Sequence, residues 1–196
     1  EVISQLSGQS LYALDADADA YLVALADGRV YMVETEHLAR QSLTTIDVTR
    51  SVCELNFSQT PACLVTEDAQ LVRDTIYRGR TIQAADTLGA AQYMLDQAVA
   101  YSLDRKQFNR AIGSFQAVKH MCAEMASQLE PCRSFVWYAG HAFDEMDKEA
   151  ALTACHAKAH LAEVGQFVAK TSTEVHGGMG FTDLVGHHYW FKRIGF

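Results

Sequence analysis

Residues 115–143 read FQAVKHMCAEMASQLEPCRSFVWYAGHAF, and the spacing of their apolar side chains decides the fold class. These side chains recur three or four positions apart without a slip, which predicts one long amphipathic helix. Pro131 lies within this period, so we expect a kink at that residue rather than the end of the helix. The apolar positions are Phe115, Val118, Cys122, Met125, Leu129, Cys132, Val136, Ala139 and Phe143.

The same period occurs on both sides of this stretch and predicts two more long helices. The earlier stripe consists of Leu88, Ala91, Leu95 and Ala98. The later stripe consists of Ala150, Ala154, Ala157, Leu161, Val164, Val168, Thr171 and Val175. Breaks are expected at residues 109–114, with Ser114 as a candidate N-cap, at the polar residues 144–147 and at the glycines of 177–180. A short fourth helix is expected to begin near Gly186.

The first third of the chain has the period of β-strands instead. Apolar runs at residues 20–25 and 30–33 flank Asp27-Gly28, a pair that favours a two-residue type I′ hairpin turn. Further on, Cys53, Leu55 and Phe57 alternate with polar residues, which predicts a strand with one buried face. Thr60-Pro61 interrupts that alternation.

Strands followed by helices predict an α+β chain, in which an antiparallel β-module precedes an antiparallel four-helix bundle. We place the β-module in residues 1–70 and the bundle in residues 71–196. The chain has 196 residues, of which 49% are hydrophobic and 20% charged, so it can bury a substantial core.

Composition also limits the classes of function. The net charge of −8 argues against a nucleic-acid-binding surface, because phosphate contacts need clustered lysines and arginines. Five cysteines, an odd number without a CxxC spacing, favour free thiols in a reducing compartment. No apolar run approaches the roughly 20 residues that span a bilayer. We therefore expect a cytoplasmic protein that binds neither nucleic acid nor membrane.

Metal sites and nucleophiles are weakly indicated. His156 and His160 lie four apart on one helix face, but the third ligand of a zinc site is missing. The spacing from Glu34 to His37 lies in the β-region, whereas a di-iron bundle needs two such pairs on helices. We expect no metal. The cysteines on or beside the helical stripes are interpreted as core thiols: Cys122, Cys132 and Cys155.

Two connections between helices carry residues suited to a nucleotide. In the first, at residues 105–117, the planar fork of Arg105 suits a pyrophosphate, Phe108 can stack on a purine, and Gln116 lies near free helical N–H groups. A charged loop that caps a bundle is an equally good interpretation of this segment alone. In the second, at residues 174–182, three glycines permit close backbone approach to a ligand. A helix C-cap is the simpler interpretation of that segment alone.

Three segments of the helical part together resemble the acyl-CoA dehydrogenase family. They read AADTLGAAQ at residues 84–92, YSLDRKQFNRAIGSFQAVKHMCAEMA at 101–126 and TSTEVHGGMGFTD at 171–183. The resemblance is strong over residues 75–193. It is looser over residues 8–65, where it rests on SGQSLYALDADADAYLVAL and the hairpin that follows.

The family fold consists of an N-terminal helical domain, a middle β-domain and a C-terminal four-helix bundle. The resemblance implies that this chain comprises the later part of the β-domain and most of the bundle, with the N-terminal helical domain absent. Because the chain opens with Glu1 rather than Met, we expect a piece of a longer protein. The family's Trp-x-Thr pattern, which lies beside the flavin, reads Tyr12-Ala13-Leu14 here.

The resemblance also implies FAD chemistry on an acyl-CoA thioester. In the family a carboxylate removes the α-proton, hydride leaves the β-carbon for the flavin, and the product is a trans-2-enoyl-CoA. Electrons then pass to an electron-transfer flavoprotein. The first step needs a positioned base and donors at the thioester oxygen. We therefore expect a flavoprotein oxidoreductase of fatty acid metabolism, and a homodimer or dimer of dimers, because the matched loop serves the cofactor of a partner subunit.

Residue by residue, the resemblance implies a cofactor-binding set and one substrate residue. Positions that hold or adjoin FAD are Arg105, Phe108, Gln116, Gly177 and Gly178. Glu174 belongs to the same set but stands where many members carry glutamine. A carboxylate near a pyrophosphate is repulsive, so Glu174 either points away or weakens binding. Arg80 matches an arginine of the first bundle helix and is assigned to the substrate.

A catalytic base is not identified by the resemblance. Some members place the base just before the arginine of the first bundle helix, where this chain has Gly79. We therefore expect this chain alone to be inactive. Two alternatives stay open. One is a non-catalytic subunit of a heteromeric acyl-CoA dehydrogenase, favoured by Gly79, Glu174 and the basic residues Lys192 and Arg193. The other is a helical interaction module without cofactor.

Overall fold

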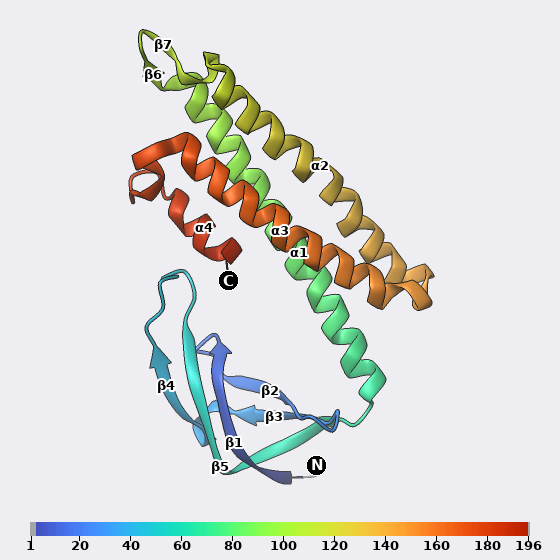
Figure 1. The fold of residues 1–196 in the computed structure, drawn as a ribbon. Helices are drawn as coiled ribbons and strands as arrows, with labels where there is room; N and C mark the ends of the chain where they lie inside the picture. Colours follow the sequence, from blue (N-terminus) through green and yellow to red (C-terminus); the bar gives the residue numbers. More distant parts are fainter. Residues whose placement is uncertain (1–2, 196) are drawn as a thin grey trace. The chain divides into compact units, whose positions relative to one another are not determined.

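The computed structural model describes residues 3–195. The chain divides into two compact units, one ending at Thr75 and the other beginning at Ile76 (Figure 1). Among the described residues, no helix combines the length and the apolarity needed to cross a bilayer.

The first unit is built around one antiparallel sheet. Its strands are β1 (Ile3–Leu14), β2 (Ala20–Ala24), β3 (Val30–Glu34), β4 (Ala39–Leu43) and β5 (Val52–Thr66), with the short helix η1 (Thr35–His37) after β3. The strand order is β1-β5-β3-β2, and β4 also pairs with β5. The long strand β5 is therefore the centre of the sheet. The predicted alternation in β5 is confirmed, because Cys53, Leu55 and Phe57 are buried in the core of this unit.

The predicted hairpin of β2 and β3 is confirmed, but the predicted turn type is wrong. The N–H of Gly28 donates to the carbonyl oxygen of Leu25 over 3.0 Å, and the N–H of Leu25 donates to that of Arg29 over 2.8 Å. The backbone φ is positive at Gly28 (+90°) but not at Asp27. A type I′ turn needs a positive φ at both central residues, so the chain uses a longer loop that ends on a single positive-φ glycine.

The alternation breaks just before Thr60-Pro61, as expected, because Ser58 and Gln59 are both exposed, but the strand itself continues to Thr66. A bulge precedes the proline, where Gln59 has a φ of +51° and the register against β1 shifts. On the opposite edge, residues 52–56 pair with β4 and residues 63–66 pair with β3. Pro61 falls in the gap between these two ladders, where a missing N–H is tolerated.

The second unit consists of helices and short connections. The helices are α1 (Ala69–Asp104), which begins within the first unit, α2 (Gln116–Glu145), α3 (Asp147–His176) and α4 (His187–Gly195). Between α1 and α2 lie the strands β6 (Lys106–Gln107) and β7 (Arg110–Ala111) and the short helix η2 (Ile112–Ser114), and between α3 and α4 lies η3 (Gly177–Phe181). The predicted breaks and the short fourth helix are thereby confirmed.

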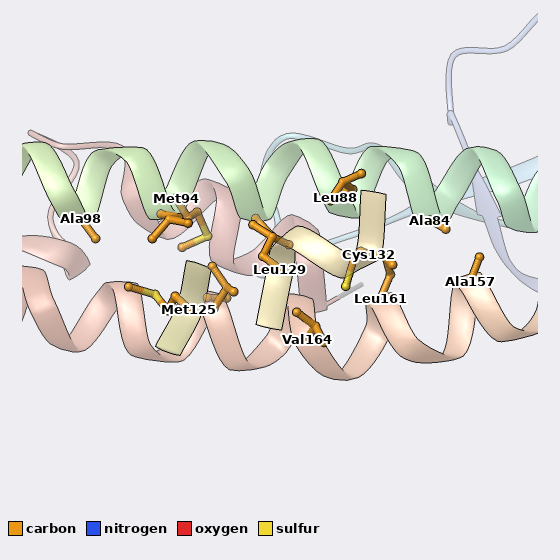
Figure 2. Close-up of a cluster of buried hydrophobic side chains, with 14 of the residues drawn as sticks. Ala84, Leu88, Met94, Ala98, Met125, Leu129, Cys132, Ala157, Leu161 and Val164 are labelled. Atoms are coloured by element: carbon orange, nitrogen blue, oxygen red, sulfur yellow. The ribbon is translucent and has the colours of Figure 1, made fainter. Parts of the chain in front are cut away.

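The three predicted apolar stripes form one core. Figure 2 shows side chains of α1, α2 and α3 meeting between the helices, among them Met94, Met125, Leu129 and Leu161. All four are at most 1% exposed. Burial of side chains of this size stabilises a fold by about 1.5–3 kcal/mol each relative to leaving them exposed. The period read from the sequence thus identifies the faces on which the helices pack.

Two details of α2 bear on the sequence predictions. The helix continues through Pro131, as expected, and the kink stays a prediction. The predicted N-cap is wrong, because Phe115 occupies that position without a side-chain cap. The hydroxyl of Ser114 donates instead to the carbonyl oxygen of Ala111 over 2.7 Å. Ser114 therefore closes η2 rather than capping α2.

Candidate functional site

The connection between α1 and α2 is a small β-hairpin that extends beyond the ends of both helices (Figure 1). We call residues 105–115 the arm. Its two-residue turn consists of Phe108 and Asn109, whose φ angles are +52° and +62°. This conformation is unfavourable for a phenylalanine. It presents the ring of Phe108 to solvent, so that 86% of the residue is exposed.

Packing within the arm holds this conformation. The guanidinium carbon of Arg110 lies 3.9 Å from the centre of the Phe115 ring, a close cation–π contact. The rings of Phe108 and Phe115 meet edge to face at 6.1 Å. At the base, a Cβ on Gly113 would lie 2.9 Å from the hydroxyl oxygen of Ser102 on α1, so only glycine fits there. The arm is thus anchored to the end of α1.

Three of the six residues assigned to the cofactor from the sequence lie in or next to this arm. Arg105 stands at its base, where its carbonyl oxygen accepts from the N–H of Ile112 over 2.8 Å, and Phe108 is at its tip. Gln116 is the first residue of α2, next to Phe115. All three side chains are exposed. Sequence reasoning gave no individual role to Arg110, whose contact with Phe115 depends on how the hairpin folds.

The second glycine-rich connection is the turn η3. Gly177 follows α3 with a φ of +58°, which explains why glycine stands there. Gly177 and Gly178 are exposed, and no atom lies within 4 Å of where a Cβ would be. Gly180 is packed, because a Cβ there would lie 3.1 Å from the carbonyl oxygen of Thr173. Glu174 is exposed on the last turn of α3.

Directly beneath this turn lies a buried polar cluster that sequence reasoning missed. The hydroxyl of Ser172 donates to the carbonyl oxygen of Met94 over 2.7 Å, and its oxygen lies 2.9 Å from Nε2 of His187. Nδ1 of His176 lies 2.8 Å from the carbonyl oxygen of Ser172. A carbonyl oxygen only accepts, so the Ser172 proton points to Met94, and Nε2 of His187 and Nδ1 of His176 are the donors.

The rings of this cluster are in close contact, with Tyr101 stacked on His176 and His187 tilted against it. Tyr101 and His176 lie 4.6 Å apart between ring centres, and His176 and His187 lie 4.2 Å apart. Nδ1 of His187 is buried without a hydrogen-bond partner. Burial, followed by the nearby His176 and His188, lowers the pKa of His187 to about 4. The imidazole of His187 is therefore neutral at pH 7, with its proton on Nε2 and a lone pair on the unpartnered Nδ1.

The residue assigned to the substrate lies elsewhere in the helical unit. Arg80 is half-buried on α1, and its Nη1 donates to the sulfur of Cys155 on α3 over 3.1 Å. Its guanidinium also lies 5.2 Å from the ring centre of Tyr77. Gly79, at the position of the base in some family members, offers no proton-accepting side chain.

The cysteines and the candidate metal ligands are unremarkable chemically. All five cysteines are free, and burial raises the pKa of the Cys122 and Cys132 thiols, in agreement with core thiols. Glu34, Glu36 and His37 bring ligand atoms within 4.8 Å of one another in the first unit. All three are exposed, and exposed acidic groups at such distances are common on protein surfaces without a metal.

Comparison with known proteins decides the family. Residues 69–194 match the family model described as acyl-CoA dehydrogenase, C-terminal domain, and this range is more than half of the chain. The chain belongs to the acyl-CoA dehydrogenase family. The resemblance stated from the three sequence segments is thereby confirmed.

Curated relatives of this acyl-CoA dehydrogenase chain are considerably longer. It is 31% identical over 183 residues to the acyl-CoA dehydrogenase IpdE2 of Mycolicibacterium smegmatis, covering 93% of the chain and 54% of that protein. It is 30% identical over 171 residues to FadE34 of Mycobacterium tuberculosis, covering 86% and 24%. It is 36% identical over 107 residues to CarC, a subunit of the caffeyl-CoA reductase-Etf complex of Acetobacterium woodii, covering 55% and 28%. The chain spans about half the length of these relatives, or less.

Solved structures share the fold of the acyl-CoA dehydrogenase chain over nearly its whole length. A variant of the Tcur3481-Tcur3483 steroid ACAD matches with a TM-score of 0.84 at 28% identity, covering 97% of this chain and 54% of that one. The ChsE4-ChsE5 complex of Mycobacterium tuberculosis matches with a TM-score of 0.82 at 26% identity, covering 97% and 54%. The predicted α+β fold class is confirmed by these matches.

Proposed function

We propose that this chain is part of an FAD-dependent acyl-CoA dehydrogenase that oxidises an acyl-CoA thioester to the trans-2-enoyl-CoA. The observation that carries the proposal is the arm. Phe108 is almost fully exposed and has an unfavourable backbone conformation beside arginines. This arrangement costs free energy unless the ring contacts a ligand or partner. Family membership supports this chemistry, and the arm is where we propose that this chain takes part in it.

The residues present fit FAD. The exposed ring of Phe108 offers a stacking face for a purine, and the exposed guanidinium of Arg105 offers a fork for a pyrophosphate. Gln116 lies in the first turn of α2, where N–H groups are free to bind a negatively charged ligand. The open space above Gly177 and Gly178 admits a ligand to the backbone. When bound, FAD supplies the hydride acceptor, and the protein supplies its position.

The direction of the arm supports a cofactor shared between subunits. The hairpin of the arm extends beyond the ends of α1 and α2 (Figure 1), and the side chains of Arg105 and Phe108 are exposed. We therefore propose a homodimer or dimer of dimers in which each arm grips the FAD of its neighbour. A relative is named as a subunit of a complex with Etf, so an electron-transfer flavoprotein is the proposed electron acceptor. Glu174 is exposed on α3. Its carboxylate would repel a pyrophosphate, so we expect this side chain to turn towards solvent.

A second candidate function is a non-catalytic subunit of a heteromeric acyl-CoA dehydrogenase. Gly79 favours it, because this chain lacks a carboxylate at one position of the family's base. A solved neighbour is itself a complex of two named proteins, ChsE4 and ChsE5. In this case Arg80 and the arm would still bind ligands, while the partner would remove the α-proton.

Spectra and turnover of the full-length parent protein distinguish these functions. We expect the purified protein to show visible flavin absorption, and to convert an acyl-CoA to the enoyl-CoA with an artificial electron acceptor. Flavin without turnover, restored by a co-expressed partner, would establish the second candidate. A colourless protein that takes up no flavin when FAD is supplied would overturn both and leave a helical interaction module.

A further inference from the structure

We propose that Ser172 is a positioning residue, whose hydroxyl joins α1, α3 and α4 and thereby holds the turn that presents Gly177 and Gly178. The link to the cofactor rests on the proposed function; the link to the turn does not. Ser172 is completely buried on α3. It donates to Met94 on α1 and accepts from His187 on α4, so one hydroxyl fixes three helices.

The two histidines close the loop between α3 and α4 at both ends. His176 is the last residue of α3, immediately before the turn, and His187 is the first residue of α4, immediately after the loop. Residues 177–186 lie between them, yet their rings lie only 4.2 Å apart. Ordering a loop of this length is entropically unfavourable, and contacts between its ends offset that cost.

Each histidine is fixed by Ser172 through a different atom. His176 donates from Nδ1 to the carbonyl oxygen of Ser172, and Tyr101 stacks on its ring. His187 donates from Nε2 to the hydroxyl oxygen. Gly177 follows His176 directly, so the orientation of that ring and the start of the turn are coupled. The turn is thus held by oriented hydrogen bonds and not by apolar burial alone.

A hydrogen-bond role and a space-filling role predict different responses to substitution. His187→Gln places an amide donor near the position of Nε2, whereas His187→Phe keeps an aromatic ring of similar shape without any donor. Ser172→Ala removes the hydroxyl and leaves both ring nitrogens of His187 without partners. Thr173→Val is the matched control, because the Thr173 hydroxyl, also buried, donates only within α3, to the carbonyl oxygen of Ala169.

Amide hydrogen exchange, resolved by mass spectrometry, tests on the chain itself whether Ser172 holds the turn. We expect Ser172→Ala and His187→Phe to speed exchange in residues 177–187 about tenfold, and His187→Gln to restore most of the protection. Thr173→Val should leave that segment unchanged. Equal losses in His187→Gln and His187→Phe would overturn the proposal. Should Ser172→Ala fail to fold, the two His187 variants alone decide it.

Flavin affinity in the parent protein separates this inference from the proposed function. If Ser172 positions Gly177 and Gly178 for the cofactor, Ser172→Ala weakens FAD binding about tenfold while Thr173→Val does not. If the parent binds no FAD at all, the proposed function fails, and exchange still decides whether Ser172 holds the turn. If exchange rises but FAD affinity stays the same, the turn is held by Ser172 without positioning the cofactor, and that part of the inference is wrong.

Discussion

Acidification is expected to destabilise the helical unit through His187. In the unfolded chain this imidazole has its usual pKa of 6.5, and in the folded protein burial and two nearby histidines lower it to about 4. Below pH 6.5 the unfolded chain therefore binds a proton that the folded protein does not. Stability falls as the pH falls from 6.5 towards 4, and this contribution is complete above 6.5. The two pKa values limit the loss to about 3.4 kcal/mol.

Urea unfolding followed by circular dichroism, at several pH values between about 7 and 4, measures this loss. His187→Gln is the reference, because it keeps a donor near Nε2 and cannot titrate. The two proteins differ only at residue 187, so the difference between their free energies of unfolding reports on His187. We expect that difference to move against the wild type by about 2–3 kcal/mol over the interval. A difference that stays constant, or that favours the wild type at low pH, would show that His187 is not held neutral by the folded protein.

Two substitutions test the core and the arm. Leu129→Ala should lower the free energy of unfolding by about 3 kcal/mol, because removal of this buried side chain leaves a cavity among the three long helices. Leu103→Ala, at a residue that is 68% exposed, should have a small effect. Denaturant titration measures both free energies of unfolding. Gly113→Ala should destabilise the arm by about 1–3 kcal/mol, because the new methyl group would overlap Ser102. Its control is Gly89→Ala, where no atom lies within 4 Å and stability should rise slightly; a Gly113→Ala variant as stable as this control would contradict the packing at Ser102.

The helices could be predicted from the sequence because their stripes are regular and long. Every position of the stripe from Ala150 to Val175 is buried. The strand β1 was missed, although it is 12 residues long. Its register against β5 shifts twice, between Leu6 and Gly8 and between Ser10 and Ala13, and each bulge breaks the alternation that marks a strand. Strand β5 continues past Pro61 because this residue lies between the part of β5 that pairs with β4 and the part that pairs with β3, and the sequence does not show that pairing.

One part of the candidate site could be predicted from the sequence and another part could not. The residues of the arm are contiguous, so the sequence brought Arg105, Phe108 and Gln116 together without any knowledge of the fold. The Ser172 cluster was missed because its partners lie 78 positions before it and 15 positions after it. A serine beside an apolar stripe and a histidine near a glycine-rich turn have no local signal of burial. Only the packing of α1, α3 and α4 joins them.

Equilibrium titration of the apo form of the full-length parent protein with FAD, followed by flavin fluorescence, measures whether the arm holds the cofactor. We expect saturable binding that weakens at least about tenfold in Arg105→Ala and in Phe108→Ala, and that stays unchanged in Lys119→Ala, an exposed cation one turn into α2. Affinities for FAD that are the same in all four proteins would contradict this expectation.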